Sequence, residues 1–379
     1  MLKEIYFDNS ATTKPSQNVA DKIQETLLKY HGNPSSLHAK GFEAETVIMC
    51  AKRHIAELFG CEPGEIYFTS GGTEANNLAI FGAAHARKRL GNKIVTTAME
   101  HDSVLSPCRE LERQGFRVTY LEPDSKGCIK IEQFLNAIDK ETILVSQMMV
   151  NNEIGCRLPT EAVRAIIEKK HAPALYHIDA VHAFSKIPVK ISALNADLIT
   201  ITAHKMHGPK GIGALFCSRN TRILPILFGG EQQNKLRPGT LATALIAGFG
   251  AAAEEAKFAP EMLKKIEKLW KRCRELLLNI DNAKINEVSH HFPYILNVSI
   301  LGIRSETMLH YLSSNGIYIS SGSACSNGKK SHVLEAMGLS KDRIESAIRI
   351  SFSKYNTLKE VEYFVSKVKS GIRKLCKSK

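Results

Sequence analysis

Short apolar segments alternate with helical segments between residues 65 and 216, and this alternation restricts the fold more than any other feature of the sequence. The apolar segments have the length of buried strands, and the segments between them carry a helical pattern. Such a rhythm is typical of a mostly parallel sheet with helices on its faces, so we expect an α/β fold. The predicted strands are EIYFTS, KIVTTA, RVTYLE, ILVSQMMV, ALYHID, ADLITITA and GALFC.

The pattern changes in the last third of the chain. Apolar residues recur at three- and four-residue steps from 260 to 280, which predicts one long amphipathic helix. Strands are expected near YILNVSI, IYIS and AIRISFS, followed by a last helix over about 358–375. We therefore expect a large domain over residues 13–255 and a smaller α+β domain formed by residues 1–12 and 256–379.

The composition is that of an ordinary globular protein. No apolar stretch is long enough to cross a bilayer and MLKEIYFDNS lacks an apolar signal core, so we expect a cytosolic protein away from membranes. The nine cysteines are scattered singly, so neither a disulfide framework nor a metal site is expected. The net charge of +13 raises the alternative of an RNA-binding scaffold. Because the basic residues are spread along helices, a solvated surface without stable nucleic-acid binding is favoured.

Polar residues follow several of the predicted strands, where ligands bind in sheets of this kind. Gly71, Gly72 and Thr73 follow the first strand and precede a helix, so backbone N–H groups there are suited to a phosphate. Asp179 and Lys205 follow two later strands. Each of these features also has an ordinary explanation, since many helices begin with Gly-Gly-Thr, an aspartate caps helices, and lysines are common in loops.

Together these residues indicate a pyridoxal phosphate (PLP) site. PLP needs a lysine for its aldehyde, a carboxylate for its ring nitrogen and a cradle for its phosphate. A lysine in a glycine-rich turn after a buried strand is partly desolvated, which favours the neutral amine that this chemistry needs. His101 and Asn152 end two further strands and are expected in the same crevice.

A thiol stands in the polar stretch SGSACSNGKK, where Cys325 lies among turn-forming residues. An exposed cysteine near positive charge is a potential nucleophile. With these residues in place, the sequence resembles the cysteine desulfurases, fold-type I PLP enzymes of the aminotransferase class V group that includes the NifS- and IscS-like sulfur donors. The resemblance rests on the following stretches in family order: FDNSATTKP, HGNPSSLHAKG, TSGGTEANN, EHDSV, VNNEIG, HIDAV, AHKMHGPKGIGAL, LRPGTL, SSGSACS and AIRIS.

The resemblance implies a role for each matching residue. Lys205 would hold the cofactor, Asp179 would pair with its ring nitrogen, and His101 would stack on its ring and move protons. Asn152 would lie near the cofactor oxygen and the substrate, and Arg349 would bind the substrate carboxylate. The remaining cofactor contacts would come from Gly72, Thr73, His182, Thr202, His204 and, across a homodimer interface, Thr240.

The implied reaction is the removal of sulfur from L-cysteine, with L-alanine as the other product. Either Lys205 or His101 would remove the α-proton, and the Cys325 thiolate would attack the substrate sulfur. The resulting persulfide would pass to an acceptor protein for tRNA thiolation, thio-cofactor synthesis or iron–sulfur assembly. Another PLP lyase, such as a selenocysteine lyase, or an aminotransferase is the alternative enzyme.

The sequence departs from the family pattern at two informative places. His182 stands where glutamine is usual, and we expect a neutral replacement because an imidazole N–H has similar reach. Family members that supply iron–sulfur scaffolds have about two more residues between the cysteine and the S-x-V-L helix start, which is Ser331 to Leu334 here. At about 3.5 Å per residue, the shorter segment has up to about 7 Å less reach, which favours a close-docking acceptor.

Overall fold

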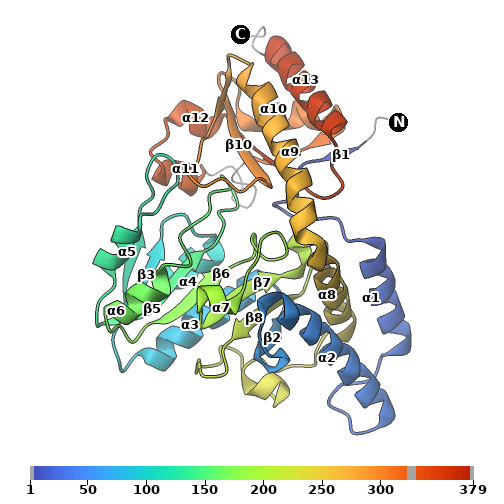
Figure 1. The fold of residues 1–379 in the computed structure, drawn as a ribbon, viewed down its shortest axis with the longest axis vertical. Coiled ribbons are helices and arrows are strands. Elements are labelled where there is room, and N and C mark those ends of the chain that lie inside the picture. Colours follow the sequence, from blue (N-terminus) through green and yellow to red (C-terminus); the bar gives the residue numbers. More distant parts are fainter. Residues whose placement is uncertain (1–3, 322–329, 376–379) are drawn as a thin grey trace.

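A seven-stranded sheet forms the lower half of the molecule in Figure 1. The computed structural model describes residues 4–321 and 330–375. In this sheet β8 runs antiparallel to both of its neighbours, whereas all other neighbouring strands are parallel. In spatial order the strands are β2 (Ile66–Thr69), β8 (Gly213–Cys217), β7 (Leu198–Thr202), β6 (Leu175–Asp179), β5 (Thr142–Met148), β3 (Lys93–Thr97) and β4 (Arg117–Leu121).

This sheet confirms the expected α/β fold with a mostly parallel sheet. Every residue of β5, β6, β7 and β8 is buried, as expected for strands that are covered on both faces. The helices that belong to this half of the chain are α1 (Gln17–Lys29), α2 (Ala39–Phe59), α3 (Gly72–Arg87), α4 (Asp102–Arg113), α5 (Ile131–Ala137), α6 (Val163–Lys169), α7 (Ile191–Leu194) and α8 (Thr243–Glu255).

Small residues let α8 lie close to two other helices. A Cβ atom on Gly250 would lie 2.7 Å from the Cα atom of Ala51 in α2, and one on Gly248 would lie 2.6 Å from the side chain of Ile23 in α1. The apolar stretch 244–253 is therefore a packed core helix. Within residues 4–321 and 330–375, no helix combines the length and apolar character needed to span a membrane.

The upper half of Figure 1 holds two smaller sheets. β1 (Ile5–Tyr6) pairs in parallel with β11 (Ile317–Tyr318). An antiparallel sheet has the order β12 (Ala347–Ser351), β10 (Ile295–Ile300) and β9 (Ala283–Ile285). The helices here are α9 (Ala259–Leu278), α10 (Ser305–Ser313), α11 (His332–Ala336), α12 (Lys341–Glu345) and α13 (Leu358–Leu375).

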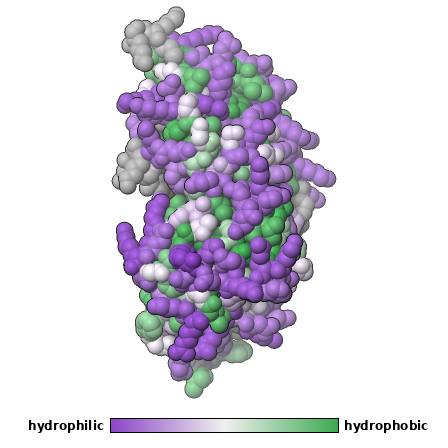
Figure 2. All heavy atoms as spheres, turned by 90° about the vertical axis from the view of Figure 1, so that its left-hand side faces the viewer, coloured by the Kyte–Doolittle hydropathy of each residue, from purple (hydrophilic) through white to green (hydrophobic). Residues whose placement is uncertain are grey.

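Long-range contacts bring the start of the chain to its last strand. Asp8 forms a bridge with Ser351, and the backbone N–H of Ser351 donates to the carbonyl oxygen of Phe7 at 2.7 Å. The segment after β1 then leads to the large sheet, where the N–H of Thr13 donates to the carbonyl oxygen of His204 at 2.9 Å. Residues 7–13 therefore connect the two halves at the candidate site. On the face shown in Figure 2, hydrophilic side chains cover most of the surface.

Candidate active site

Three of the sequence-predicted residues meet at one edge of the large sheet. Asp179 ends β6, Lys205 lies in the turn after β7, and His101 immediately precedes α4 after β3. Burial raises the pKa of Asp179, and the hydrogen bonds from Val181 and Asn76, followed by the nearby His101 and Lys205, act in the opposite direction. These mutual effects place the three groups in one electrostatic environment.

The Asp179 carboxylate is oriented by two donors. The backbone N–H of Val181 donates to Oδ1 at 2.9 Å, and the Asn76 amide donates to Oδ2 at 2.8 Å. Both contacts favour the ionised carboxylate over the protonated one. The strand end thus presents a fixed negative charge, as the ring nitrogen of the cofactor requires.

The first turn of α3 is open to an anion. Gly71 precedes this helix without a side-chain cap. A Cβ atom on Gly213 would lie 2.7 Å from the backbone carbon of Gly71, so only glycine lets β8 and the helix start approach so closely. A Cβ atom on Gly72 would lie 3.1 Å from the Val181 side chain. Thr73 is exposed beside these N–H groups, and their contact with a phosphate stays a prediction.

Thr202 and His204 lie at the end of β7, next to Lys205. Thr202 is buried and its hydroxyl donates to the carbonyl oxygen of Ile212 at 3.2 Å. The Nδ1 atom of His204 lies 3.3 Å from the Thr12 hydroxyl. Burial, followed by the charge of Lys205, lowers the pKa of His204 to about 4, so this ring is neutral at pH 7.

A two-point ion pair connects the loop that contains Thr240 to the helix start at Gly72 and Thr73, the predicted phosphate cradle. The Arg237 guanidinium donates to both Glu74 carboxylate oxygens, at 2.7 and 3.1 Å, and Glu74 belongs to the first turn of α3. Thr240 follows in the same loop and is exposed. Its contact with a neighbouring subunit stays a prediction.

Lys205 and Arg349 converge on the segment after β1. The Lys205 ammonium donates to the carbonyl oxygens of Ser10 and Ala11. Arg349 is buried and donates from Nη1 to the carbonyl oxygen of Asn152 at 2.9 Å and from Nη2 to Asp8 at 3.0 Å. Its Nε atom is buried and has no hydrogen-bond partner within the part of the chain that the structure describes. The structure thus brings Asn152 and Arg349 together, although Arg349 contacts the backbone carbonyl of Asn152 and not its side chain.

His182 is also buried at this site, and none of the described residues forms a hydrogen bond with its Nδ1 atom. Burial, together with the charge of Lys205, holds the pKa of His182 well below its usual range. The ring is therefore neutral and retains one N–H for donation. This is the state that the predicted replacement of glutamine by histidine requires.

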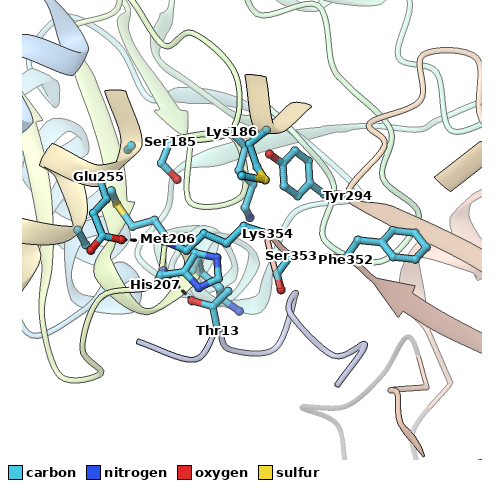
Figure 3. Close-up of a pocket in the computed structure, with 14 residues that line it drawn as sticks. Thr13, Ser185, Lys186, Met206, His207, Glu255, Tyr294, Phe352, Ser353 and Lys354 are labelled. Atoms are coloured by element: carbon cyan, nitrogen blue, oxygen red, sulfur yellow. Dashed lines mark hydrogen bonds and ion pairs between the residues drawn. The ribbon is translucent and has the colours of Figure 1, made fainter. Parts of the chain in front are cut away.

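A cavity of about 80 Å³ adjoins Lys205 (Figure 3). Lys186 lies in its wall, with its ammonium 5.6 Å from the centre of the Tyr294 ring. Burial and the nearby charge of Lys205 lower the pKa of Lys186 to about 7. The environment around Lys205 is thus unfavourable for a second positive charge.

Comparisons with known proteins agree with this arrangement. The model of the aminotransferase class-V family matches residues 5–364. The mitochondrial cysteine desulfurase of Arthroderma benhamiae is 41% identical over 379 residues, with 98% of this chain and 75% of that protein covered. The cysteine desulfurase IscS of Mannheimia succiniciproducens is 40% identical over 381 residues, with 98% and 93% covered. The chain belongs to the cysteine desulfurases of the aminotransferase class-V family.

Solved structures of the cysteine desulfurase family have the same fold. A NifS-like protein superimposes with a TM-score of 0.92 at 37% identity, covering 97% of this chain and 99% of the other. The NifS-like protein of Rickettsia africae superimposes with a TM-score of 0.88 at 30% identity, covering 98% and 100%. The expected fold-type I PLP architecture is therefore confirmed.

The residues present fit PLP, the cofactor of the cysteine desulfurases. The fixed Asp179 carboxylate suits a protonated ring nitrogen, and the open first turn of α3 suits a phosphate. The Nδ1 atom of His182, which has no partner among the described residues, is a buried polar atom that a ligand would satisfy. The ring nitrogen and the phosphate of the cofactor thus each have a matching group on this chain, and His182 can satisfy a further polar atom.

Cys325 of this cysteine desulfurase lies outside the described residues. The described chain resumes close after it, where Ser331 caps α11 and its hydroxyl donates to the buried Glu153 carboxylate. Sequence reasoning gave no role to Asp8, Asn76 or Ser103. All three lie in matching stretches, namely FDNSATTKP, TSGGTEANN and EHDSV, but Asn76 and Ser103 lie on helices, where no strand-end signal marks them.

Proposed function

We propose that this protein uses PLP to take the sulfur of L-cysteine, leaving L-alanine. The observation that carries this proposal is the buried Arg349 guanidinium, which is held by two acceptors and whose Nε–H has no partner among residues 4–321 and 330–375. A buried donor without a partner is costly unless a ligand satisfies it, and a carboxylate is the partner that arginine binds best. The α-carboxylate of an amino acid therefore suits this position.

Bound PLP supplies an electron sink for the charge that develops at the α-carbon. Lys205 would hold the cofactor aldehyde, and Asp179 would hold the proton on the ring nitrogen. Gly72, Thr73, Thr202, His204 and, from a second subunit, Thr240 would contact the phosphate, and His182 would donate to the ring hydroxyl. His101 would cover the ring.

Cys325 would carry the sulfur. Its thiolate attacks the substrate sulfur, the carbon–sulfur bond breaks, and the electron pair of that bond returns to the substrate carbon, which takes up a proton to give alanine. Cys325 then holds a persulfide, whose outer sulfur passes to a thiol of an acceptor protein. The short segment after Cys325 favours an acceptor that docks close to the site, whether for tRNA thiolation, thio-cofactor synthesis or iron–sulfur assembly.

The proposal includes a cytosolic homodimer in which residues 13–255 form the large domain and residues 1–12 and 256–379 form the small one. The connection of residues 7–13 to both halves supports a site shared by the two domains. We expect this protein to form no stable complex with nucleic acid.

The test is the reaction of the purified protein with L-cysteine and a reductant. We expect a visible cofactor band that is lost in Lys205→Ala, and equal amounts of sulfide and alanine. In Cys325→Ala we expect sulfide release to be lost while the band remains. A need for a 2-oxo acid would identify an aminotransferase, and activity with selenocysteine alone would identify a selenocysteine lyase. A colourless protein that binds tRNA in a salt-sensitive way would be an RNA-binding scaffold.

A further inference from the structure

A chain of hydrogen bonds joins Asp179 to His101 through two residues outside the predicted site. The Asn76 amide nitrogen lies 2.8 Å from Asp179 Oδ2 and 2.9 Å from the Ser103 hydroxyl. That hydroxyl lies 2.8 Å from His101 Nδ1. Asn76 and Ser103 are both buried. The four side chains therefore form one continuous network across α3, α4 and β6.

The direction of each bond in this network is determined by its chemistry. The ionised Asp179 only accepts, so the Asn76 amide donates to it and, with its second N–H, to the Ser103 oxygen. The backbone N–H of Ser103 also points at His101 Nδ1, at 3.1 Å. A backbone N–H can only donate, so Nδ1 must be the unprotonated nitrogen. The Ser103 hydroxyl then donates to the same atom, and the proton of the neutral ring lies on Nε2.

The surroundings of His101 also disfavour its charged form. Burial is the main cause of its lowered pKa, and the nearby Lys205 and His332 act in the same direction. Asp179 and Asp102 act in the opposite direction. His101 also caps the N-terminus of α4, where the helix dipole disfavours a cation. Protonation of the His101 ring would put a hydrogen on Nδ1, directly facing the N–H of Ser103. Because that N–H belongs to the backbone, it cannot turn away.

We propose that Asn76 and Ser103 are positioning residues that hold His101 as a neutral ring with its proton on Nε2. A ring held in this way has no free nitrogen lone pair, so His101 acts as a hydrogen-bond donor toward the cofactor and substrate and not as the base that takes the α-proton. The assignment of these two roles rests on the proposed function, whereas the position of the proton rests on the hydrogen bonds alone. It resolves the choice between Lys205 and His101 that the sequence leaves open.

The position of the proton is tested by nitrogen NMR of the holoenzyme labelled with ¹⁵N-histidine, with His101→Gln identifying the signals. We expect an unprotonated Nδ1 and a protonated Nε2 near neutral pH. In Ser103→Ala we expect the pKa of His101 to rise by roughly 0.5–1 pH unit, because the neutral ring loses one donor. Ser103→Thr keeps the hydroxyl and should restore the value. A proton on Nδ1 in the unaltered enzyme would overturn the proposal.

The two roles are tested by the exchange of the α-proton of L-alanine with solvent, which needs neither Cys325 nor an acceptor. Loss of a general base slows such a step by roughly 10²–10⁴-fold. We expect losses of that size in Lys205→Ala and less than tenfold slowing in His101→Gln. The reverse order would make His101 the base and overturn the assignment. Sulfide release from L-cysteine by the unaltered enzyme tests the proposed function separately, so its failure would leave the NMR result interpretable.

Discussion

Asp8 Oδ1 lies 3.0 Å from Arg349 Nη2, and this pair joins the segment after β1 to the central residue of β12. The Arg349 side chain is only 4% exposed and that of Asp8 20% exposed. Burial raises the pKa of Asp8, while the charge of Arg349 lowers it. Asp8 therefore helps to set the orientation of the guanidinium that we propose for the substrate carboxylate.

Two substitutions at Asp8 separate its effect on the orientation of Arg349 from the effect of its negative charge near the substrate. Asp8→Ala removes the acceptor, so we expect the KM for L-cysteine to rise roughly 10-fold or more, in keeping with the loss of a charge-assisted hydrogen bond, with a smaller change in kcat. Asp8→Asn keeps an acceptor and removes a negative charge near the substrate carboxylate, so its KM should not rise. Steady-state kinetics measure both, with Asp281→Asn as an exposed control. An unchanged KM in Asp8→Ala would show that Asp8 does not orient Arg349 for binding.

Glu100 makes the stability of the fold depend on pH. Its carboxyl group is fully buried, and burial raises its pKa to about 8 from the ordinary 4.5. Between these values the folded chain binds a proton that the unfolded chain does not, so this group makes the free energy of unfolding fall as pH rises from about 4.5 to 8. Over this pH range the group lowers the free energy of unfolding by roughly 5 kcal/mol in total.

Glu100→Gln should remove this dependence. The amide oxygen can still accept from Thr97 and from the Met148 N–H, which lie 2.7 and 2.9 Å from Oε1. Urea unfolding at several pH values measures the effect, with the exposed Glu122→Gln as control. We expect the variant to be more stable than the unaltered protein at pH 8 and to differ little at pH 5. Parallel pH curves for the two proteins would refute the buried-acid explanation.

Ser331 and Glu153 connect the start of α11 to the VNNEIG turn. The Ser331 hydroxyl donates to the Glu153 carboxylate and accepts from the Leu334 N–H at 3.2 Å. Ser331→Ala leaves a buried carboxylate without this donor and α11 without its cap, so we expect a loss of about 1–3 kcal/mol of stability. Thermal unfolding measures it, and Ser331→Thr should retain most of the stability. Equal stability in the alanine variant would mean that the contact contributes nothing.

The ion pair between Arg237 and Glu74 should contribute to cofactor retention, because it ties the 231–241 loop to the first turn of α3. We expect Arg237→Ala to weaken PLP binding roughly 10-fold, as loss of a two-point charged contact at a partly buried site does. Equilibrium dialysis of PLP measures the change. Arg222→Ala, at an exposed arginine, is the matched control. If both variants release PLP equally, the ion pair has no special role.

Much of the large sheet is predictable from its strands, because buried parallel strands give long apolar runs and their ends carry polar residues. Asp179, Lys205 and His101 were found in this way. The reversed direction of β8 could not be predicted, since a strand that is buried on both faces has the same pattern in either direction. The short strands β1 and β9 were missed because two or three residues carry no periodicity.

The polar contacts within the site are less accessible to sequence reasoning. Asp8 and Arg349 are far apart in the chain and meet only because β1 and β12 belong to adjacent small sheets. Asn76 faces Asp179 from a helix, where an asparagine gives no signal of its own. Such pairs depend on tertiary packing, which local patterns do not report. Cys325 was found from its polar surroundings, and its role stays a prediction.

The central claim is that Cys325 takes the sulfur of L-cysteine. The most direct measurement is mass spectrometry of the holoenzyme after a brief exposure to L-cysteine, without reductant and without an acceptor. We predict one added sulfur atom on the peptide that contains Cys325, and none on that peptide in Lys205→Ala. Sulfur added only to other cysteines, or full alanine formation by Cys325→Ala without any protein persulfide, would contradict the account.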